Sequence, residues 1–276
     1  MKTDIFHWRS IDNLLIYGKS WAPENEIRGV VCLVHGMGEH CGRYEFMGKF
    51  LSDTGIALIS NDQRGHGKSE GKKGHTPSYE LLLQNVHNLT QKARELFPEL
   101  PLILYGHSMG GNLVLNYAMR KKPAMNGVIA SSPYLKLAFD PPAFKVKLGQ
   151  WMKNIFPSFS QPTGLDSKAI SRIPEEVKKY EEDPLVHDRI TAMMFASVHE
   201  AGLWALQHPE ELELPLLLFH GTADKLTSYE ASKEFAGKVK GDVTFKSFEG
   251  AYHETHNDLC RDEVLSLLRG WVNEHF

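Results

Sequence analysis

A serine flanked by glycines stands between two apolar segments near the middle of the chain. The pattern G-x-S-x-G spans residues 106–110 with Ser108 at its centre, after the apolar run 101–106 and before the helix-like run 112–122. Between a strand and a helix, this pattern holds the serine on a tight turn that leaves no room for a Cβ at the two glycines. Ser108 is therefore the candidate nucleophile, and the chemistry it indicates is attack on an acyl carbon.

A serine hydroxyl is a poor nucleophile at neutral pH, so it needs a histidine base and a carboxylate that orients the histidine. Asp224 and His253 each come directly after an apolar run that predicts a strand. Serine, acid and histidine in that order along the chain is the order expected when each follows a strand of one sheet. The predicted catalytic triad is Ser108, Asp224 and His253, with His256 as the rival base.

Attack on an ester places negative charge on the carbonyl oxygen, which two backbone N–H groups must stabilise in an oxyanion hole. One is expected from Met109, directly after the serine. The other is expected after the strand-like run 29–35, where the glycines of HGMG at residues 35–38 let the backbone turn an amide inward. Met37 is the predicted donor, and its side chain is free to line an acyl pocket.

Two other kinds of site have weaker support. HETH at residues 253–256 is one residue short of the zinc-binding pattern H-E-x-x-H. The glycines of GMGEHCG at residues 36–42 are spaced G-x-G-x-x-x-G, whereas a dinucleotide site has G-x-G-x-x-G. Such a site also uses an acidic residue further along the chain, and Asp62 at the end of the next predicted strand is already explained by the turn at residues 61–71. A dinucleotide site is therefore disfavoured. We expect neither a metal nor an organic cofactor.

The composition limits the partners and the compartment. The 276 residues carry a net charge of −3, which argues against a nucleic-acid partner because such proteins need a basic surface. Three cysteines without a C-x-x-C pair disfavour a disulfide framework. No signal peptide is visible, and no apolar run approaches the ~18 residues that a membrane helix needs. We expect a cytoplasmic protein, with peripheral membrane contact left open and the oligomeric state unpredicted.

Apolar runs and helix-like runs alternate over most of the chain, which predicts an α/β fold with a mostly parallel central sheet flanked by helices. The alternation fails between residues 134 and 210, where helical patterns and prolines predict a helical cap insertion between core segments 1–133 and 211–276. The expected strands are an N-terminal hairpin at 4–10 and 14–23, then 29–35, 56–62, 101–106, 125–133, 214–221 and 243–250. The expected core helices are 43–55, 78–97, 112–122, 228–239 and 261–276.

With these residues in place, the sequence resembles serine hydrolases of the α/β-hydrolase fold, most of all the monoacylglycerol lipase and lysophospholipase branch. The resemblance implies hydrolysis of carboxylic esters of single-chain lipids through an acyl-enzyme, most of all of monoacylglycerol to fatty acid and glycerol. The matching stretches are HGMGEHCGRY (35–44), NDQRGHGKSEG (61–71), YGHSMGG (105–111), LPLLLFHGTAD (214–224) and GAYHETH (250–256).

The resemblance also suggests head-group contacts. In this family the stretch that matches residues 35–44 lies near the glycerol head group, which implies substrate-binding roles for Glu39, Arg43 and His256. The simpler alternative is that Glu39 and Arg43 pair with each other or cap the helix that follows.

Large apolar side chains are frequent in the predicted cap, which is too small to bury all of them on itself. We expect some to line a groove above Ser108 that takes an acyl chain, and transient contact of the cap with a membrane or micelle surface is a hypothesis that the same side chains suggest. These side chains are Leu135, Leu137, Phe139, Phe144, Trp151, Met152, Ile155, Phe156, Phe159, Met193, Met194, Phe195 and Trp204.

Several alternatives share the same catalytic residues. A lysophospholipase or general carboxylesterase would differ only in its head-group contacts. An acyltransferase or perhydrolase would differ in the acceptor that replaces water. A non-catalytic lipid-binding module usually lacks a triad member, whereas all three are present here. Haloalkane dehalogenases and epoxide hydrolases use an aspartate where Ser108 stands, which disfavours them.

Overall fold

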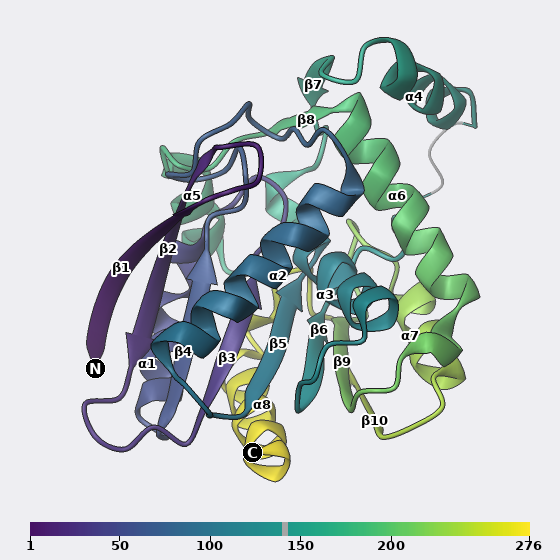
Figure 1. Cartoon of the computed structure of the whole chain (residues 1–276). Coiled ribbons are helices and arrows are strands. Elements are labelled where there is room, and N and C mark those ends of the chain that lie inside the picture. Colours follow the sequence, from purple (N-terminus) through teal and green to yellow (C-terminus); the bar gives the residue numbers. More distant parts are fainter. Residues whose placement is uncertain (140–142) are drawn as a thin grey trace.

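An eight-stranded sheet runs through the centre of the molecule (Figure 1). The computed structural model describes the backbone of residues 1–139 and 143–276, and the side chains of residues 1–139 and 149–276. The order of the strands is β1-β2-β4-β3-β5-β6-β9-β10, with β1, β2 and β4 paired antiparallel and the other pairs parallel. The strands are β1 Lys2–Arg9, β2 Leu15–Ala22, β3 Gly29–Val34, β4 Ile56–Asn61, β5 Leu102–His107, β6 Gly127–Ser131, β9 Leu216–Gly221 and β10 Val243–Phe248.

The strands β3, β4, β5, β6 and β9 are buried on both faces, which explains their largely apolar sequences, whereas the edge strand β10 is partly exposed. Along β3, Val30 and Cys32 pack into the cluster under α2, α3 and α7, whereas Val31 and Leu33 pack into the cluster under α1 and α8. This alternation follows from the two-residue period of a strand. The core helices are α1 Glu45–Ser52, α2 Tyr79–Leu96, α3 Met109–Lys121, α7 Tyr229–Lys238 and α8 Arg261–His275.

The predicted fold class is confirmed, and most element boundaries agree within a few residues. The N-terminal hairpin is present as β1 and β2, and Ser78 caps α2 by accepting a hydrogen bond from the Leu81 amide. The helix predicted from residue 112 begins at Met109 instead, because the turn at Ser108 leads directly into it. The helix predicted at residues 43–55 is shorter, since residues 41–44 form a 3-10 turn and α1 ends at Ser52.

The chain between β6 and β9 lies over the end of the sheet at which the parallel strands finish (Figure 1). We propose that this segment is the cap predicted at residues 134–210. The short sheet formed by β7 and β8 is a feature that the sequence pattern did not predict. The elements of the segment are α4 Ala143–Ile155, β7 Ser160–Pro162, α5 Pro174–Glu182, β8 Arg189–Thr191 and α6 Ala192–Gln207.

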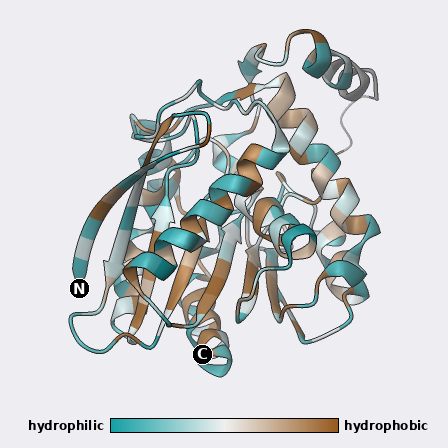
Figure 2. Cartoon of the chain, viewed as in Figure 1, coloured by the Kyte–Doolittle hydropathy of each residue, from teal (hydrophilic) through white to brown (hydrophobic). Residues whose placement is uncertain are grey.

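Polar side chains of α3 hold this segment to the core. Asn112 of α3 donates through Nδ2 to the carbonyl oxygens of Tyr134 and Val198, at 2.8 and 3.0 Å. Arg120, two turns further along α3, stacks on the ring of Trp204 at 3.9 Å. Figure 2 shows hydrophobic residues concentrated in the strands of the central sheet. Within the described residues, no helix combines the length and the apolar character needed to cross a membrane.

Candidate active site

Ser108 occupies a strained turn between β5 and α3. Its φ of 54° and ψ of −115° lie in a region that residues with a Cβ rarely adopt. A Cβ on Gly106 would lie 2.3 Å from the carbonyl oxygen of Gly110, and a Cβ on Gly110 would lie 1.9 Å from that of Val34. The prediction that the turn needs glycine at both positions is therefore confirmed, and the turn places Ser108 in the wall of a cavity.

Asp224 and His253 form a buried pair, 2.7 Å apart between Oδ2 and Nδ1. Asp224 lies in the loop after β9, and His253 lies in the loop after β10, as the sequence predicted. Burial raises the pKa of Asp224, but the adjacent His253 and the hydrogen bonds it accepts hold that pKa far below its ordinary value. Asp224 therefore remains a carboxylate at any pH where the protein would work.

Two further side chains contact the Asp224 carboxylate and were missed from the sequence. Nε2 of His220 lies 2.9 Å from Oδ2, and the Thr227 hydroxyl donates to the same oxygen at 2.9 Å. The backbone N–H groups of Leu226 and Thr227 donate to Oδ1 at 2.7 and 3.1 Å. The Leu226 contact is that of an Asx turn, in which an aspartate side chain accepts from the backbone two residues on.

His253 presents its other ring nitrogen away from Asp224, and its side chain lines the same cavity as Ser108. Burial lowers the pKa of His253, but Asp224, followed by Glu254 and Glu39, raises it, and the net pKa lies above the ordinary value. The Ser132 hydroxyl donates to the His253 carbonyl at 2.8 Å and fixes the backbone there. The ring of His107 packs 4.8 Å from that of His253, between centroids, and His107 also lines the cavity.

The loop after β3 brings Met37 to the same cavity. The Gly36 N–H is already used, because it donates to Oε1 of Glu39 at 2.7 Å. A Cβ on Gly36 would lie 3.2 Å from the Cβ of Ser108, so this backbone passes directly beside the candidate nucleophile. Within the described part of the chain, the amides of Met37 and Met109 donate to no protein acceptor, which leaves both for a ligand oxygen.

Glu39 and Arg43 pair with each other, since Nη1 of Arg43 donates to Oε2 of Glu39 at 2.8 Å. This is the simpler of the two interpretations that the sequence allowed. Glu39 also lines the cavity, whereas Arg43 is not among the described residues that do so. Arg43 additionally contacts Glu254, a residue that the sequence did not single out. The predicted contact of Glu39 and Arg43 with a head group stays a prediction.

His256 is buried behind the cavity rather than in its described lining. Its ring stacks on Tyr44 with centroids 5.2 Å apart and meets the edge of His107 at 4.8 Å. Burial lowers its pKa to about 4, so it is neutral near pH 7. The hydrogen bond to Asp224 belongs to His253, which favours His253 over His256 as the base.

The cavity that contains Ser108 and His253 has a volume of about 420 Å³. Its apolar lining is Met37, Leu165, Ile170, Val186 and Leu226, and its polar lining includes Thr163, Ser167, Tyr180 and His187. Carboxylates are frequent in the wall, and no lysine or arginine is among the lining residues that the structure describes. The carboxylates are Glu39, Asp166, Glu181, Asp183, Asp188 and Glu254.

The cap residues that line this cavity differ from those predicted. Leu165, Ile170 and Val186 line it, and none of them belongs to the large apolar set that the sequence suggested. Within that set, Leu135 and Met194 are buried in the core cluster, and Trp204 packs against that cluster. The side chain of Phe144 lies outside the described residues. The exposed members are Phe139, Trp151, Ile155, Phe156 and Phe159.

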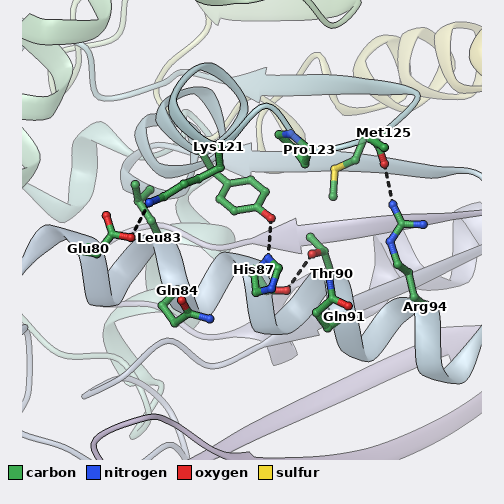
Figure 3. Close-up of a pocket in the computed structure, with 12 residues that line it drawn as sticks. Glu80, Leu83, Gln84, His87, Thr90, Gln91, Arg94, Lys121, Pro123 and Met125 are labelled. Atoms are coloured by element: carbon green, nitrogen blue, oxygen red, sulfur yellow. Dashed lines mark hydrogen bonds and ion pairs between the residues drawn. The ribbon is translucent and has the colours of Figure 1, made fainter.

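A second hollow of about 390 Å³ lies between α2 and the end of α3 (Figure 3). Its charged groups and its histidine are already bonded to neighbours: Lys121 pairs with Glu80, the His87 ring bonds to the Tyr117 hydroxyl, and Arg94 donates to a backbone carbonyl. Neither Ser108 nor a member of the buried Asp–His pair reaches it. The cavity at Ser108 is therefore the candidate active site.

Comparison with known proteins agrees with this choice. A family model described as "Serine aminopeptidase, S33" matches residues 25–260. A monoacylglycerol lipase of Mycolicibacterium smegmatis is 32% identical over 92% of this chain and 91% of its own length. The chain is a member of this family, in its monoacylglycerol lipase branch. The predictions of an α/β-hydrolase and of a carboxylic ester hydrolase in that branch are confirmed.

Two further members of the family are similar over nearly the whole chain. The crystal structure of a Paleococcus ferrophilus monoacylglycerol lipase is 36% identical, covers 100% of both chains and has a TM-score of 0.86. An uncharacterized abhydrolase domain-containing protein of Dictyostelium discoideum is 35% identical over 96% of this chain. The chain spans 29% of the length of that Dictyostelium protein, so it corresponds to one part of it.

Proposed function

We propose that this enzyme hydrolyses the ester bond of a monoacylglycerol, releasing a fatty acid and glycerol, with Ser108 as the nucleophile. The observation that carries the proposal is the buried pair of Asp224 and His253 opening into the same cavity as Ser108. Two relatives that are similar over nearly the full length of the chain are named monoacylglycerol lipases, which supports the substrate class.

In the first half of the reaction, His253 accepts the hydroxyl proton of Ser108 through Nε2 as the serine oxygen bonds to the ester carbon. The amides of Met37 and Met109 donate to the oxyanion that forms. The Asp224 carboxylate keeps the proton on Nδ1 and stabilises the imidazolium. When the intermediate collapses, the bond to the alcohol oxygen breaks and His253 returns the proton to that oxygen.

In the second half, water replaces the alcohol. His253 accepts a proton from the water as its oxygen bonds to the acyl carbon. Collapse of the second oxyanion breaks the bond to Ser108, whose oxygen takes the proton back from His253. The fatty acid then leaves and the enzyme is regenerated. No step needs a metal or an organic cofactor.

The charge in the cavity favours a neutral head group. Asp166, Glu181 and Asp188 form no ion pair with any cation that the structure describes, and no such cation lines the wall beside them. An anionic phosphate would meet uncompensated carboxylates, whereas glycerol hydroxyls can donate to them. Leu165, Ile170 and Val186 offer apolar surface for the acyl chain.

Fatty-acid release from 1-monooleoylglycerol, lysophosphatidylcholine and lysophosphatidic acid, with Ser108→Ala as the blank, tests this substrate class. The expected result is release from the monoacylglycerol at a rate well above that from the anionic lysophosphatidic acid. Equal or faster release from lysophosphatidic acid would contradict the neutral-head-group proposal. Lysophosphatidylcholine, a zwitterion, tests the lysophospholipase alternative directly.

We further propose that the cap touches lipid surfaces. Trp151, Ile155, Phe156 and Phe159 are between 46% and 60% exposed, and α4 stands at the outer edge of the cap (Figure 1). Exposed aromatic side chains grouped in this way are typical of sites that insert into a membrane interface.

Sedimentation with phosphatidylcholine vesicles tests the lipid contact. The double variant Trp151→Ala/Phe156→Ala should bind roughly tenfold more weakly than the wild type, because the burial of two large aromatic side chains is lost. Ile11→Ala removes an 80% exposed apolar side chain from the N-terminal hairpin and should bind like the wild type. Equal binding by all three proteins, or none by the wild type, would contradict the proposal.

A further inference from the structure

Arg43 lies between two carboxylates that come from different loops. Its Nη1 donates to Oε2 of Glu39 at 2.8 Å, and its two Nη atoms form a bidentate pair with Glu254 at 2.8 and 2.7 Å. The side chain is 11% exposed, and the ring of Tyr180 from the cap covers the guanidinium at 4.8 Å. Arg43 is a buried bridge between loops rather than a surface charge.

The Glu39 end of this bridge fixes the loop that passes beside Ser108. Oε1 of Glu39 accepts from the Gly36 N–H at 2.7 Å and from the Tyr44 hydroxyl at 2.9 Å, while Oε2 accepts from Arg43. With the Gly36 N–H held by the carboxylate, the amide of Met37 is the next one along the chain that can face the cavity. The position of Glu39 therefore sets the orientation of a proposed oxyanion donor.

The Glu254 end fixes the loop that carries the candidate base, because Glu254 directly follows His253. Its backbone N–H donates to the Ile170 carbonyl at 2.8 Å, and its carboxylate accepts from Nδ2 of Asn257 at 2.8 Å. Its side chain is 4% exposed. Loss of Arg43 would leave this carboxylate buried without its cation, one residue from the base.

The three charged groups also act on His253 through space. Burial raises the pKa of Glu254, but Arg43, followed by His256 and the hydrogen bond from Asn257, lowers it, and the net pKa is about 2. Two carboxylates and one guanidinium leave one net negative charge behind the base. Burial lowers the pKa of His253, and Asp224, followed by Glu254 and Glu39, raises it above its ordinary value. The cluster thus supports the imidazolium that forms during catalysis.

We propose that Arg43 is a positioning residue that joins the oxyanion loop to the base loop through Glu39 and Glu254, rather than a head-group contact. The inference rests on the proposed serine mechanism. The Nη atoms of Arg43 are already bonded to two carboxylates, and Arg43 is not among the described residues that line the cavity. A glycerol hydroxyl would have to displace one of these charged partners to reach it.

Two substrates separate the roles, because p-nitrophenyl butyrate has an ester bond but no glycerol, whereas 1-monooleoylglycerol has both. Arg43→Met should lower kcat by ~100-fold on both substrates, with KM changed by less than about threefold, because displacement of both loops misplaces the reacting groups. Arg43→Lys should recover part of kcat, since lysine keeps the charge but not the fork. Arg64→Met is the matched control, because Arg64 is a buried arginine that pairs with Asp12 outside the cavity.

A rise in KM for 1-monooleoylglycerol, with normal turnover of p-nitrophenyl butyrate, would contradict positioning and support a head-group contact. An equal loss of kcat in Arg64→Met would also contradict it, because the effect would then be one of general stability. A wild type that cleaves p-nitrophenyl butyrate but not 1-monooleoylglycerol would overturn the proposed substrate, and the comparison of variants on the first ester would still test Arg43.

Glu254→Gln keeps the shape of the side chain and removes its charge, so it tests the inference even if Arg43→Met does not fold. The expected result is a lower kcat on both substrates and an acid limb of kcat/KM at lower pH than in the wild type, because His253 loses part of the charge that raises its pKa. An acid limb that does not move would contradict the electrostatic part of the proposal.

Discussion

Asp224→Asn should nearly abolish turnover while the protein stays folded. In the wild type, Oδ2 of Asp224 lies within hydrogen-bond distance of three groups: Nδ1 of His253 at 2.7 Å, Nε2 of His220 at 2.9 Å and the Thr227 hydroxyl at 2.9 Å. An asparagine can place either its oxygen or its NH₂ group there, and the two choices have different consequences for His253.

If Oδ1 of the asparagine keeps the two backbone donors of Leu226 and Thr227, its NH₂ group must face His253. His253 must then accept at Nδ1, so its proton moves to Nε2, the nitrogen that has to receive the proton of Ser108. A histidine in this tautomer is not a base toward the serine, and the corresponding substitution in a serine protease costs ~10⁴ in kcat. That factor equals about 5 kcal/mol of lost transition-state stabilisation.

The assay is steady-state hydrolysis of p-nitrophenyl butyrate between pH 5 and pH 9, with circular dichroism and urea unfolding as folding controls. Thr227→Val is the matched control, because it removes one donor to Asp224 and leaves the carboxylate in place. We expect Thr227→Val to lose only about tenfold, the value of one hydrogen bond to a charged group. An Asp224→Asn enzyme that retains more than about a tenth of wild-type kcat while folded would show that the Asp224 carboxylate does not set the tautomer of the base.

Three further predictions follow from the site. The acid limb of kcat/KM for the wild type should lie above pH 6.5, since His253 must be neutral to act as the base and its pKa is raised; a pH–rate profile that is flat down to pH 5.5 would contradict this. Gly110→Ala should lower the free energy of unfolding by roughly 3 kcal/mol, because the new Cβ would lie 1.9 Å from the Val34 carbonyl oxygen. Gly270→Ala places its Cβ in open space and should leave the stability unchanged, and urea unfolding of both variants measures the difference. Asp188→Lys should raise the rate on lysophosphatidic acid relative to 1-monooleoylglycerol by roughly tenfold, because a carboxylate beside the head group becomes a cation, and an unchanged ratio would show that Asp188 does not face the head group.

Much of the core could be predicted because its elements obey local rules. Strands buried on both faces have continuous apolar sequences, and the turn at Ser108 carries the glycines that its geometry requires. Their order along the chain and their positions directly after strands predicted that Asp224 and His253 would meet. Oδ2 of Asp224 lies 2.7 Å from Nδ1 of His253. These features depend on neighbours in sequence and on the ends of adjacent strands.

The features that the sequence did not predict depend on contacts between distant segments. The partner of Arg43 is 211 residues away, and no local pattern around Glu254 indicates it. In the cap, Leu165 and Val186 line the cavity from irregular segments, whereas Trp151 and Ile155 are exposed on the helix α4. Periodicity predicts that a segment is helical, but not which face of a cap helix meets the core.

Covalent trapping of the nucleophile tests the central claim most directly. The enzyme is incubated with a fluorophosphonate ester, digested and mapped by mass spectrometry, and Ser108→Ala is treated in parallel. We expect one phosphonyl adduct per chain, on Ser108, with loss of hydrolysis in proportion to labelling and no adduct on Ser108→Ala. An adduct on another residue, or a Ser108→Ala enzyme that still hydrolyses 1-monooleoylglycerol, would contradict it.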